Sequence, residues 1–183
     1  DQVAEQAEDD IGETMAWVRD RELLYGPESL LALYGNVVPF ICSNTRQYPD
    51  IFLQRAAALT LCKFMCISAE YCEANLGLLL HLLRTSKDAV VRANAVIGLG
   101  DVAVCFGTLV DENSERLYAG LGDKDLGVKK NTLMVLTHLI LNGMIKVKGQ
   151  LGELAKCLED EEMRVSDLAK LFFSELAAKE NAV

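Results

Sequence analysis

The sequence contains no run of apolar residues as long as the roughly 18 that a membrane-spanning helix needs. It also contains no stretch in which apolar and polar residues alternate strictly for long enough to predict a β-strand. Proline is scarce, with three residues in 183, whereas hydrophobic residues make up 51% of the chain. This hydrophobic content excludes wholesale disorder, because it allows a continuous core to form. We therefore expect a helical chain with no membrane partner.

Positive charge is missing from the N-terminal end. Residues 1–13 hold six acids and no base, and residues 1–10 lack the apolar segment of a secretory signal. We predict that residues 1–13 are an acidic tail or the remnant of a loop, and that residues 14–183 form one folded segment. Because the chain begins without Met and its first clear repeat starts within a series, we expect a fragment of a larger protein.

The net charge of −9 is unevenly placed, since the 170 residues after position 13 carry 21 acids against 18 bases. A nearly neutral body is not typical of a general nucleic-acid binder, which shows a basic face overall. Residues 124–150 are an exception, with five lysines against Asp125 alone. This stretch leaves open the alternative that the chain binds nucleic acid directly through its lysines.

The sequence also lacks the residue constellations that catalysis requires. It has no glycine-rich phosphate loop, Walker motif or metalloprotease histidine pair. Asp101 and His138 lie within apolar helical segments, but no Ser or Cys nucleophile accompanies them in a strained turn. A hydrogen-bonded polar residue at a repeat junction is the better interpretation of each, because buried polar groups normally have partners. We expect no enzyme activity, no cofactor and no small-molecule substrate.

The six cysteines do not follow a metal-binding or disulfide pattern. Cys62, Cys66 and Cys72, together with His81, could suggest a metal site, but the common Cys-x2-Cys spacing is missing. Cys62 and Cys66 are one helical turn apart in an apolar segment, so we predict that they are buried and behave as small hydrophobes. The pattern favours a reducing compartment, with no metal site and no disulfide.

A short pattern recurs four times at intervals of 37 to 38 residues. Each copy contains an apolar residue that we call its anchor, and the four anchors are Leu53, Val91, Val128 and Val165. Apolar residues recur four, eight and eleven positions after each anchor, with Thr132 the one polar member. A fixed period in this range is typical of a solenoid, in which each unit buries its apolar face against its neighbours. Such proteins present long surfaces that hold other macromolecules. The four copies are Asp50-x-x-Leu53, Asp88-x-x-Val91, Asp125-x-x-Val128 and Glu162-x-x-Val165.

Each repeat is predicted to contain two helices, the second of which begins at the acidic residue of the pattern, a residue type suited to capping. Pro39 should kink the helix in which it lies, because proline removes a backbone donor and clashes with the preceding turn. The expected helices are 11–24, 29–45, 51–68, 73–84, 89–106, 113–121, 126–142, 150–158 and 162–178.

Paired helices of this length, with a proline in a first helix and Asp-x-x-Val-Arg opening a second, resemble HEAT repeats. Three longer strings are more specific and resemble the condensin subunit 1 family, whose members are non-SMC regulators of the condensin ring. The strings are RANAVIGLGDVAV at 92–104, KNTLMVLTHLILNGMIKVKGQ at 130–150 and FFSELAAKENAV at 172–183. The resemblance covers about residues 14–183 and implies an all-α HEAT-repeat superhelix of about four helix pairs plus a leading helix.

The resemblance also implies a function. Members of this family are non-catalytic; they bind the kleisin subunit, contact an SMC ATPase head and help the complex to compact chromosomes in mitosis. Chromosomal DNA would be a partner through the complex. The expected location is the nucleus and the chromosome, and the cytoplasm for part of the cell cycle.

The first candidate partner-binding site is the connection formed by Lys146, Val147, Lys148, Gly149 and Gln150. Two lysines around one valine indicate an exposed loop, and a glycine lets its backbone approach a partner closely. The family has a lysine–glycine loop that meets the SMC head, and this string resembles it. An ordinary solvated connector is the simpler alternative.

The second candidate is a row of polar residues near the start of successive second helices, where equivalent positions form a ladder along one solenoid face. Arg92 and Lys129 are expected to pair within the chain, with Asp88, Asp125 or neighbouring acids. Such pairs would fix the stacking of the repeats more than they stabilise it. The other members are free to form a polar groove for a peptide or for phosphates, and they are Asn94, Lys130 and Asn131.

Overall fold

The computed structural model describes residues 2–145 and 150–180, and no residue in these ranges belongs to a strand. This confirms the predicted all-α class. None of the helices described is long and apolar enough to cross a membrane. The second helices of the four pairs are α4 (Ile51–Met65), α6 (Ala89–Cys105), α9 (Leu126–Leu141) and α11 (Met163–Glu180).

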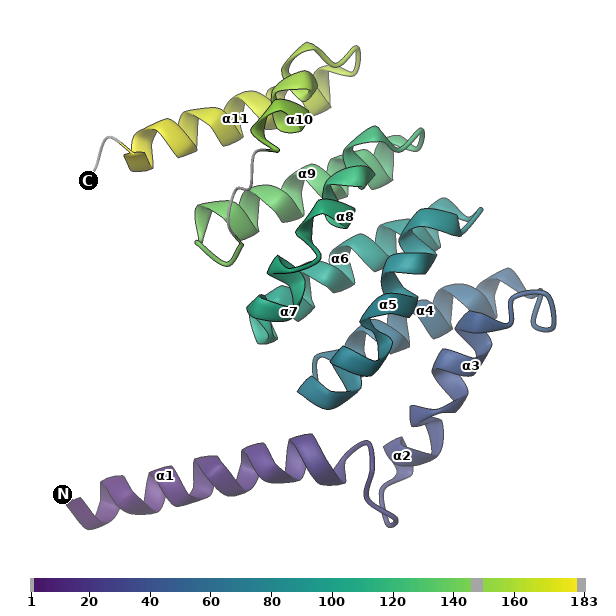
Figure 1. Ribbon diagram of the computed structural model, residues 1–183, viewed down its shortest axis with the longest axis vertical. Helices are drawn as coiled ribbons and strands as arrows, with labels where there is room; N and C mark the ends of the chain where they lie inside the picture. The colour runs from purple at the N-terminus through teal and green to yellow at the C-terminus, as the bar shows by residue number, and fades with distance from the viewer. Residues whose placement is uncertain (1, 146–149, 181–183) are drawn as a thin grey trace.

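The four second helices lie side by side as one layer, in which α6 packs between α4 and α9, and α9 packs against α11 (Figure 1). The first helices cross over them as a second layer. The first helices are α2 (Leu30–Gly35) with α3 (Val37–Ser43), α5 (Ala69–Thr85), α7 (Gly107–Asp111) with α8 (Ser114–Tyr118), and α10 (Leu151–Lys156).

The N-terminal segment differs from the expected tail. Helix α1 (Gln2–Trp17) continues into the π-helical turn η1 (Val18–Glu22), so most of residues 1–13 is helical. The acidic composition hid a run rich in Ala, Glu and Gln, which are strong helix formers. Helix α1 extends away from the stack in Figure 1, and its side chains Ile11 and Met15 are exposed.

Pro39 was predicted to kink the expected helix 29–45, and the structure breaks this helix at Asn36, three residues before Pro39, into α2 and α3. A helical residue donates its N–H to the carbonyl four residues earlier, so proline at position 39 leaves the carbonyl of Gly35 without that donor. The buried hydroxyl of Tyr71, on α5, donates to this oxygen at 2.7 Å. The break therefore becomes a contact between the first two helix pairs.

Aspartate caps begin three of the second helices at the predicted positions. The side chains of Asp50, Asp88 and Asp125 accept hydrogen bonds from the backbone N–H three residues later, at 2.7, 3.0 and 3.1 Å. Each such cap contributes about 1 kcal/mol to stability.

The anchors and the residues four, eight and eleven positions after them, which we call the core columns, are buried in the middle repeats. Ala95, Leu99 and Leu136 are at most 1% exposed. The columns open at the ends of the stack, where Leu53 is 39% exposed and Phe173 is partly buried, because no further repeat covers them in the described residues.

The first helices depart most from the expected pattern. The expected helix 113–121 is α8 followed by the 3-10 turn η2 (Ala119–Gly122), and α7 precedes it where no helix was predicted. In the last pair, α10 is likewise followed by the 3-10 turn η3 (Cys157–Glu159).

Candidate partner-binding surface

Ion pairs link each repeat to the next. Arg55 pairs with Asp88 at 2.7 Å, and Lys129 pairs with Asp160 at 2.7 Å. Between them, Arg92 binds Asp123 through two hydrogen bonds of 2.7 and 2.9 Å. We call these three contacts the ion-pair ladder.

The middle rung of the ladder is the most enclosed. The side chains of Arg92 and Asp123 are only 8% and 12% exposed, and Arg92 also donates to the carbonyl of Ser86 at 2.9 Å. The hydrogen bonds from the guanidinium lower the pKa of Asp123 below its ordinary value. Asp123 in turn accepts the backbone N–H of Asp125 at 2.8 Å, so both partners are held in place.

The prediction that Arg92 and Lys129 pair within the chain is confirmed, and their partners are neighbouring acids rather than Asp88 or Asp125. Asp88 is already bound by Arg55 of the preceding repeat and caps α6, and Asp125 caps α9. Asp123 lies two residues before Asp125, the cap of α9, and there it reaches Arg92 of the preceding repeat.

An apolar column runs along the exposed side of the second helices. Its members occupy the sixth position after the anchor in four successive helices, and they are between 43% and 54% exposed. Because these helices lie side by side, the column crosses all four repeats. We call it the apolar stripe, and it consists of Leu59, Ile97, Met134 and Leu171.

Asn94 and Asn131 border the apolar stripe. Each lies three residues before a stripe residue, which places it on the same face of its helix. Both are partly exposed, and their side-chain amides make no hydrogen bond with any described residue. Lys130 is also partly exposed and has no ion pair within residues 2–145 and 150–180. The structure therefore brings these three predicted residues together beside the apolar stripe.

Of the other candidate connection, the structure describes Gln150 alone, which lies apart from this group. Lys146, Val147, Lys148 and Gly149 are outside the described residues. Gln150 is partly buried at the start of α10, which follows the C-terminal end of α9, whereas Asn131 lies near the N-terminal end of that helix.

Asp101 and His138 are exposed, not buried at a repeat junction as expected. Both occupy the tenth position after the anchor, four residues beyond a stripe residue, so they form the other border of the apolar stripe. The ring Nδ1 of His138 lies 3.2 Å from the side-chain amide nitrogen of Asn142. Among the described residues, no Ser, Thr or Cys side chain forms a hydrogen bond with the imidazole of His138.

The cysteines form no disulfide, and the buried ones pack within the core. Burial raises the pKa of Cys62 to about 12 and that of Cys42 to about 11, which keeps both thiols protonated. Among the described residues, no group of three or more His, Cys, Asp or Glu side chains is arranged to hold a metal ion.

The lysines of 124–150 do not gather into one patch in the described structure. Lys124 lines a cavity beside α5 and α8, Lys129 is paired with Asp160, and Lys130 lies on the side that bears the apolar stripe. The alternative of direct nucleic-acid binding through this stretch therefore has no continuous basic surface among the residues described.

Stacked helix pairs, capped by Asp in successive repeats and joined by an ion-pair ladder, define a HEAT-like helical repeat protein. The family model for the non-SMC mitotic condensation complex subunit 1 matches residues 90–183. The chain belongs to this family.

Relatives of this family match nearly the whole chain. The chain is 49% identical over 176 residues to condensin complex subunit 1 of Saccharomyces cerevisiae, and the aligned region covers 96% of this chain and 15% of that protein. It is 48% identical over 183 residues to condensin complex subunit 1 of Schizosaccharomyces pombe, covering 100% and 16%. For condensin complex subunit 1 of Homo sapiens the identity is 40% over 181 residues, covering 99% and 13%. The chain thus spans about one sixth or less of the length of these relatives.

Proposed function

We propose that this chain is a non-catalytic segment of a condensin subunit 1 that holds the kleisin subunit along its apolar stripe and docks an SMC ATPase head. Its role would be in mitotic chromosome condensation, and its location the nucleus and the chromosome, with a cytoplasmic phase in the cell cycle. Membership of the family supports the complex in which it works. The apolar stripe is the observation that carries the partner-binding role.

The regularity of the apolar stripe sets it apart from ordinary exposed apolar residues. Single exposed hydrophobic side chains are common on protein surfaces and need no explanation. Four of them at one repeat position, on four neighbouring helices, instead form a continuous surface of the kind that marks an interaction site. All four are at least 43% exposed, so a partner could bury a large part of each.

The dimensions of the apolar stripe suit an extended peptide. Packed helices lie about 8–10 Å apart, and an extended chain rises about 3.3 Å per residue. About every third residue of such a peptide would therefore meet the next stripe residue. Asn94 and Asn131 stand beside the stripe with free amides, each able to donate to and accept from a peptide backbone.

The kleisin role is tested by replacing Ile97 and Met134 together with glutamine, which removes apolar surface and keeps a good helix former. We expect binding of a kleisin segment, measured by titration calorimetry, to weaken at least tenfold. Leu30→Gln with Leu33→Gln, at two exposed leucines on α2 outside the stripe, is the matched control and should bind as the unaltered chain does. Equal affinity of both double variants would refute the assignment.

Docking of the SMC head is assigned to the connection 146–150, through resemblance to the family's lysine–glycine loop. Lys146→Glu with Lys148→Glu and Gly149→Val should weaken binding of an isolated head, since charges at an interface steer and register the partner. Kleisin binding and the thermal melt should stay unchanged. A variant that binds the head normally would show that this connection is an ordinary linker.

A further inference from the structure

A groove separates α5 from the unit formed by α8 and η2. It has a cavity volume of about 970 Å³ and is lined mainly by the first helices and the loops that follow them, and none of its lining residues belongs to the apolar stripe. The groove exists because small residues form much of its lining, namely Gly77 on α5 and Ala119, Gly120 and Gly122 on η2. The buried side chains of Leu80 and Leu83 give it an apolar lining as well.

The groove is strongly basic, although the whole chain has a net charge of −9. All four cationic residues are exposed, and no side chain among them forms an ion pair or hydrogen bond with any described residue: Arg84, Lys87, Arg116 and Lys124. The one carboxylate among the lining residues, Asp123, is already occupied by Arg92. Four cationic side chains without an ion-pair partner in the described residues are therefore gathered around one cavity.

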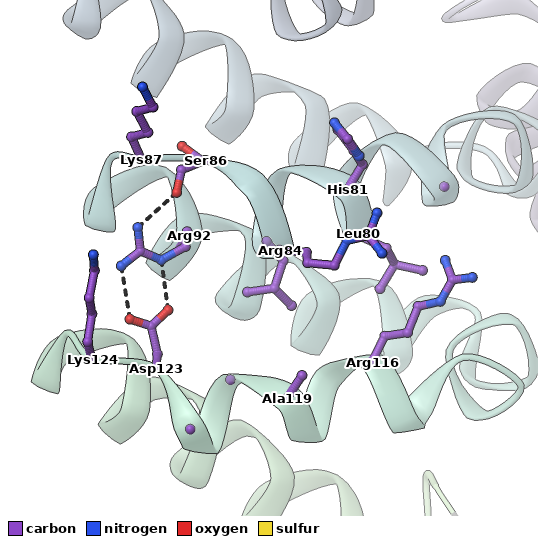
Figure 2. A pocket seen from close by; sticks show the side chains of 14 residues that line it. Leu80, His81, Arg84, Ser86, Lys87, Arg92, Arg116, Ala119, Asp123 and Lys124 are labelled. Atoms are coloured by element: carbon purple, nitrogen blue, oxygen red, sulfur yellow. Dashed lines mark hydrogen bonds and ion pairs between the residues drawn. The ribbon is translucent and has the colours of Figure 1, made fainter.

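The two walls of the groove are fixed to each other by the middle rung of the ion-pair ladder. Figure 2 shows the Arg92–Asp123 pair at the end of the cavity where Lys87 and Lys124 lie, with His81 and Arg116 toward the other end. Because Arg92 also holds the carbonyl of Ser86, both interhelical loops are tied to one guanidinium. The groove is thus formed before a ligand arrives, which lowers the entropy cost of binding.

The basic lining continues into the preceding repeat and stops at the last one. A second cavity, of about 440 Å³, shares His81, Ser86 and Lys87 with the first and adds Arg46. In the opposite direction, the loop position of Lys87 and Lys124 is occupied by Glu161. The charges therefore form a short track across three repeats rather than a broad basic face.

We propose that this track binds an extended acidic peptide, in which carboxylate or phosphoserine groups are spaced along the chain. Guanidinium groups such as those of Arg84 and Arg116 bind carboxylate and phosphate through paired hydrogen bonds, and clusters of arginine are a recurrent means of recognising acidic or phosphorylated motifs. The small and apolar lining admits the peptide backbone and uncharged side chains between the charged ones.

The surroundings favour a peptide over duplex DNA. A duplex carries a dense row of phosphates on both strands and is bound by a wide basic surface. Here exposed acids flank the track, with Glu73 four residues before Gly77 on α5, Glu115 beside Arg116, and Glu161 in the next repeat. A single extended chain fits between these acids, whereas a duplex would overlie them.

The test uses fluorescent peptides of about eight residues, because three repeats span two helix spacings of about 8–10 Å and an extended chain crosses them in about six residues. Three peptides share one sequence and carry glutamate, phosphoserine or glutamine at four positions. Fluorescence anisotropy with the full chain should show binding of the glutamate or phosphoserine peptide, weakening as ionic strength rises from about 0.01 to about 0.15 M. The glutamine peptide should not bind.

Arg84→Gln with Arg116→Gln should weaken binding of the acidic peptide at least tenfold. Lys63→Gln with Arg164→Gln removes the same net charge from exposed positions on second helices and should leave the affinity unchanged. An equal loss of affinity in both variants would show that net charge alone attracts the peptide, and it would overturn the proposal. Tighter binding of a short DNA duplex, sensitive to the arginine variant, would assign the groove to nucleic acid instead.

The result is separate from the proposed kleisin role. The stripe variant Ile97→Gln with Met134→Gln should bind the acidic peptide as the unaltered chain does, because no residue of the apolar stripe lines the groove. Loss of peptide binding in that variant would place the peptide on the stripe and refute the groove assignment.

Discussion

At the residue scale, Gly98 determines how closely two second helices approach. It is buried on α6, and a Cβ atom at this position would lie 2.1 Å from the Sγ of Cys62 on α4. Real Cβ atoms do not tolerate such a contact, so an alanine here must push the helices apart or displace the thiol. The string that carries the family resemblance thus includes a residue with a direct packing role.

Gly98→Ala should lower the free energy of unfolding by about 1–3 kcal/mol, the usual cost of overpacking a core. Urea denaturation followed by circular dichroism measures the change. Gly77→Ala is the matched control, because its Cβ would meet nothing within 4 Å. It should be neutral or stabilising by up to about 1 kcal/mol, since alanine restricts the unfolded chain. Equal stability of the two variants would contradict the packing role of Gly98.

At the scale of the helices, the ion-pair ladder joins elements whose sequence separation hides the pairing. The pairs are separated by 33, 31 and 31 residues. Their contributions should differ, because the desolvation of a charge left without its partner depends on burial. The Arg92–Asp123 pair is the most buried, and Lys129–Asp160 is about one fifth exposed.

Asp123→Asn should therefore destabilise the chain more than Asp160→Asn. Loss of the buried pair is expected to cost about 3–5 kcal/mol, whereas loss of the more exposed pair should cost about 1 kcal/mol or less. Both carboxylates also accept a backbone N–H two residues later, so the two changes are closely matched. A larger loss for Asp160→Asn in chemical denaturation would contradict the ranking by burial.

The same pairs predict a dependence of stability on pH. Hydrogen bonds from Arg55, Arg92 and Lys129 lower the pKa values of Asp88, Asp123 and Asp160 in the folded chain. A depressed folded pKa contributes stability that is present above the unfolded value of about 3.9 and is lost as the pH falls through the folded value.

The free energy of unfolding should therefore fall below about pH 4, and the fall should be smaller in Asp123→Asn than in the unaltered chain. Urea midpoints between neutral and acidic pH measure this. Parallel curves for the two proteins would show that Asp123 contributes nothing to the acid dependence.

The second helices could be predicted from the sequence, because an acidic cap and a 3.6-residue apolar period occur together. The helices expected at 89–106 and 126–142 are α6 and α9 to within one residue at either end. The first helices could not be predicted as well, since Gly120 and Gly122 weaken the helical pattern and a 3-10 turn replaces the last turn. The first part of α1 was not predicted, because its many acidic residues suggested a solvated tail although Ala, Glu and Gln are strong helix formers.

At the scale of the whole molecule, sequence reasoning predicted Asn94 and Asn131 as partner-binding candidates but did not predict the apolar stripe beside them. The signal was present, because the sixth position after each anchor is apolar in all four repeats although it lies outside the core columns. The basic groove could not be found in this way. Its cations come from two helices and two loops of different repeats, and only the packing of α5 against η2 brings them to one cavity.

The stacked arrangement predicts that stability is highest in the middle and falls toward the ends. In a repeat array each unit is stabilised chiefly by its neighbours. Helix α6 packs against α4, α5, α7 and α9, whereas the main contact of α1 is the adjoining turn η1. Hydrogen exchange followed by mass spectrometry should therefore show the slowest exchange in α6 and α9 and the fastest in α1.

Gly98→Ala provides the decisive comparison for this gradient, because it disturbs one interface of the stack. If stability is the sum of neighbouring contacts, the variant should speed exchange in α4 and α6 strongly and in α11 little. The contact of Gly98 with Cys62 lies between α4 and α6. Two further interfaces, α6–α9 and α9–α11, separate it from α11, and the substitution changes neither of them. A uniform increase in exchange across all helices would instead show that the chain unfolds as a single cooperative unit.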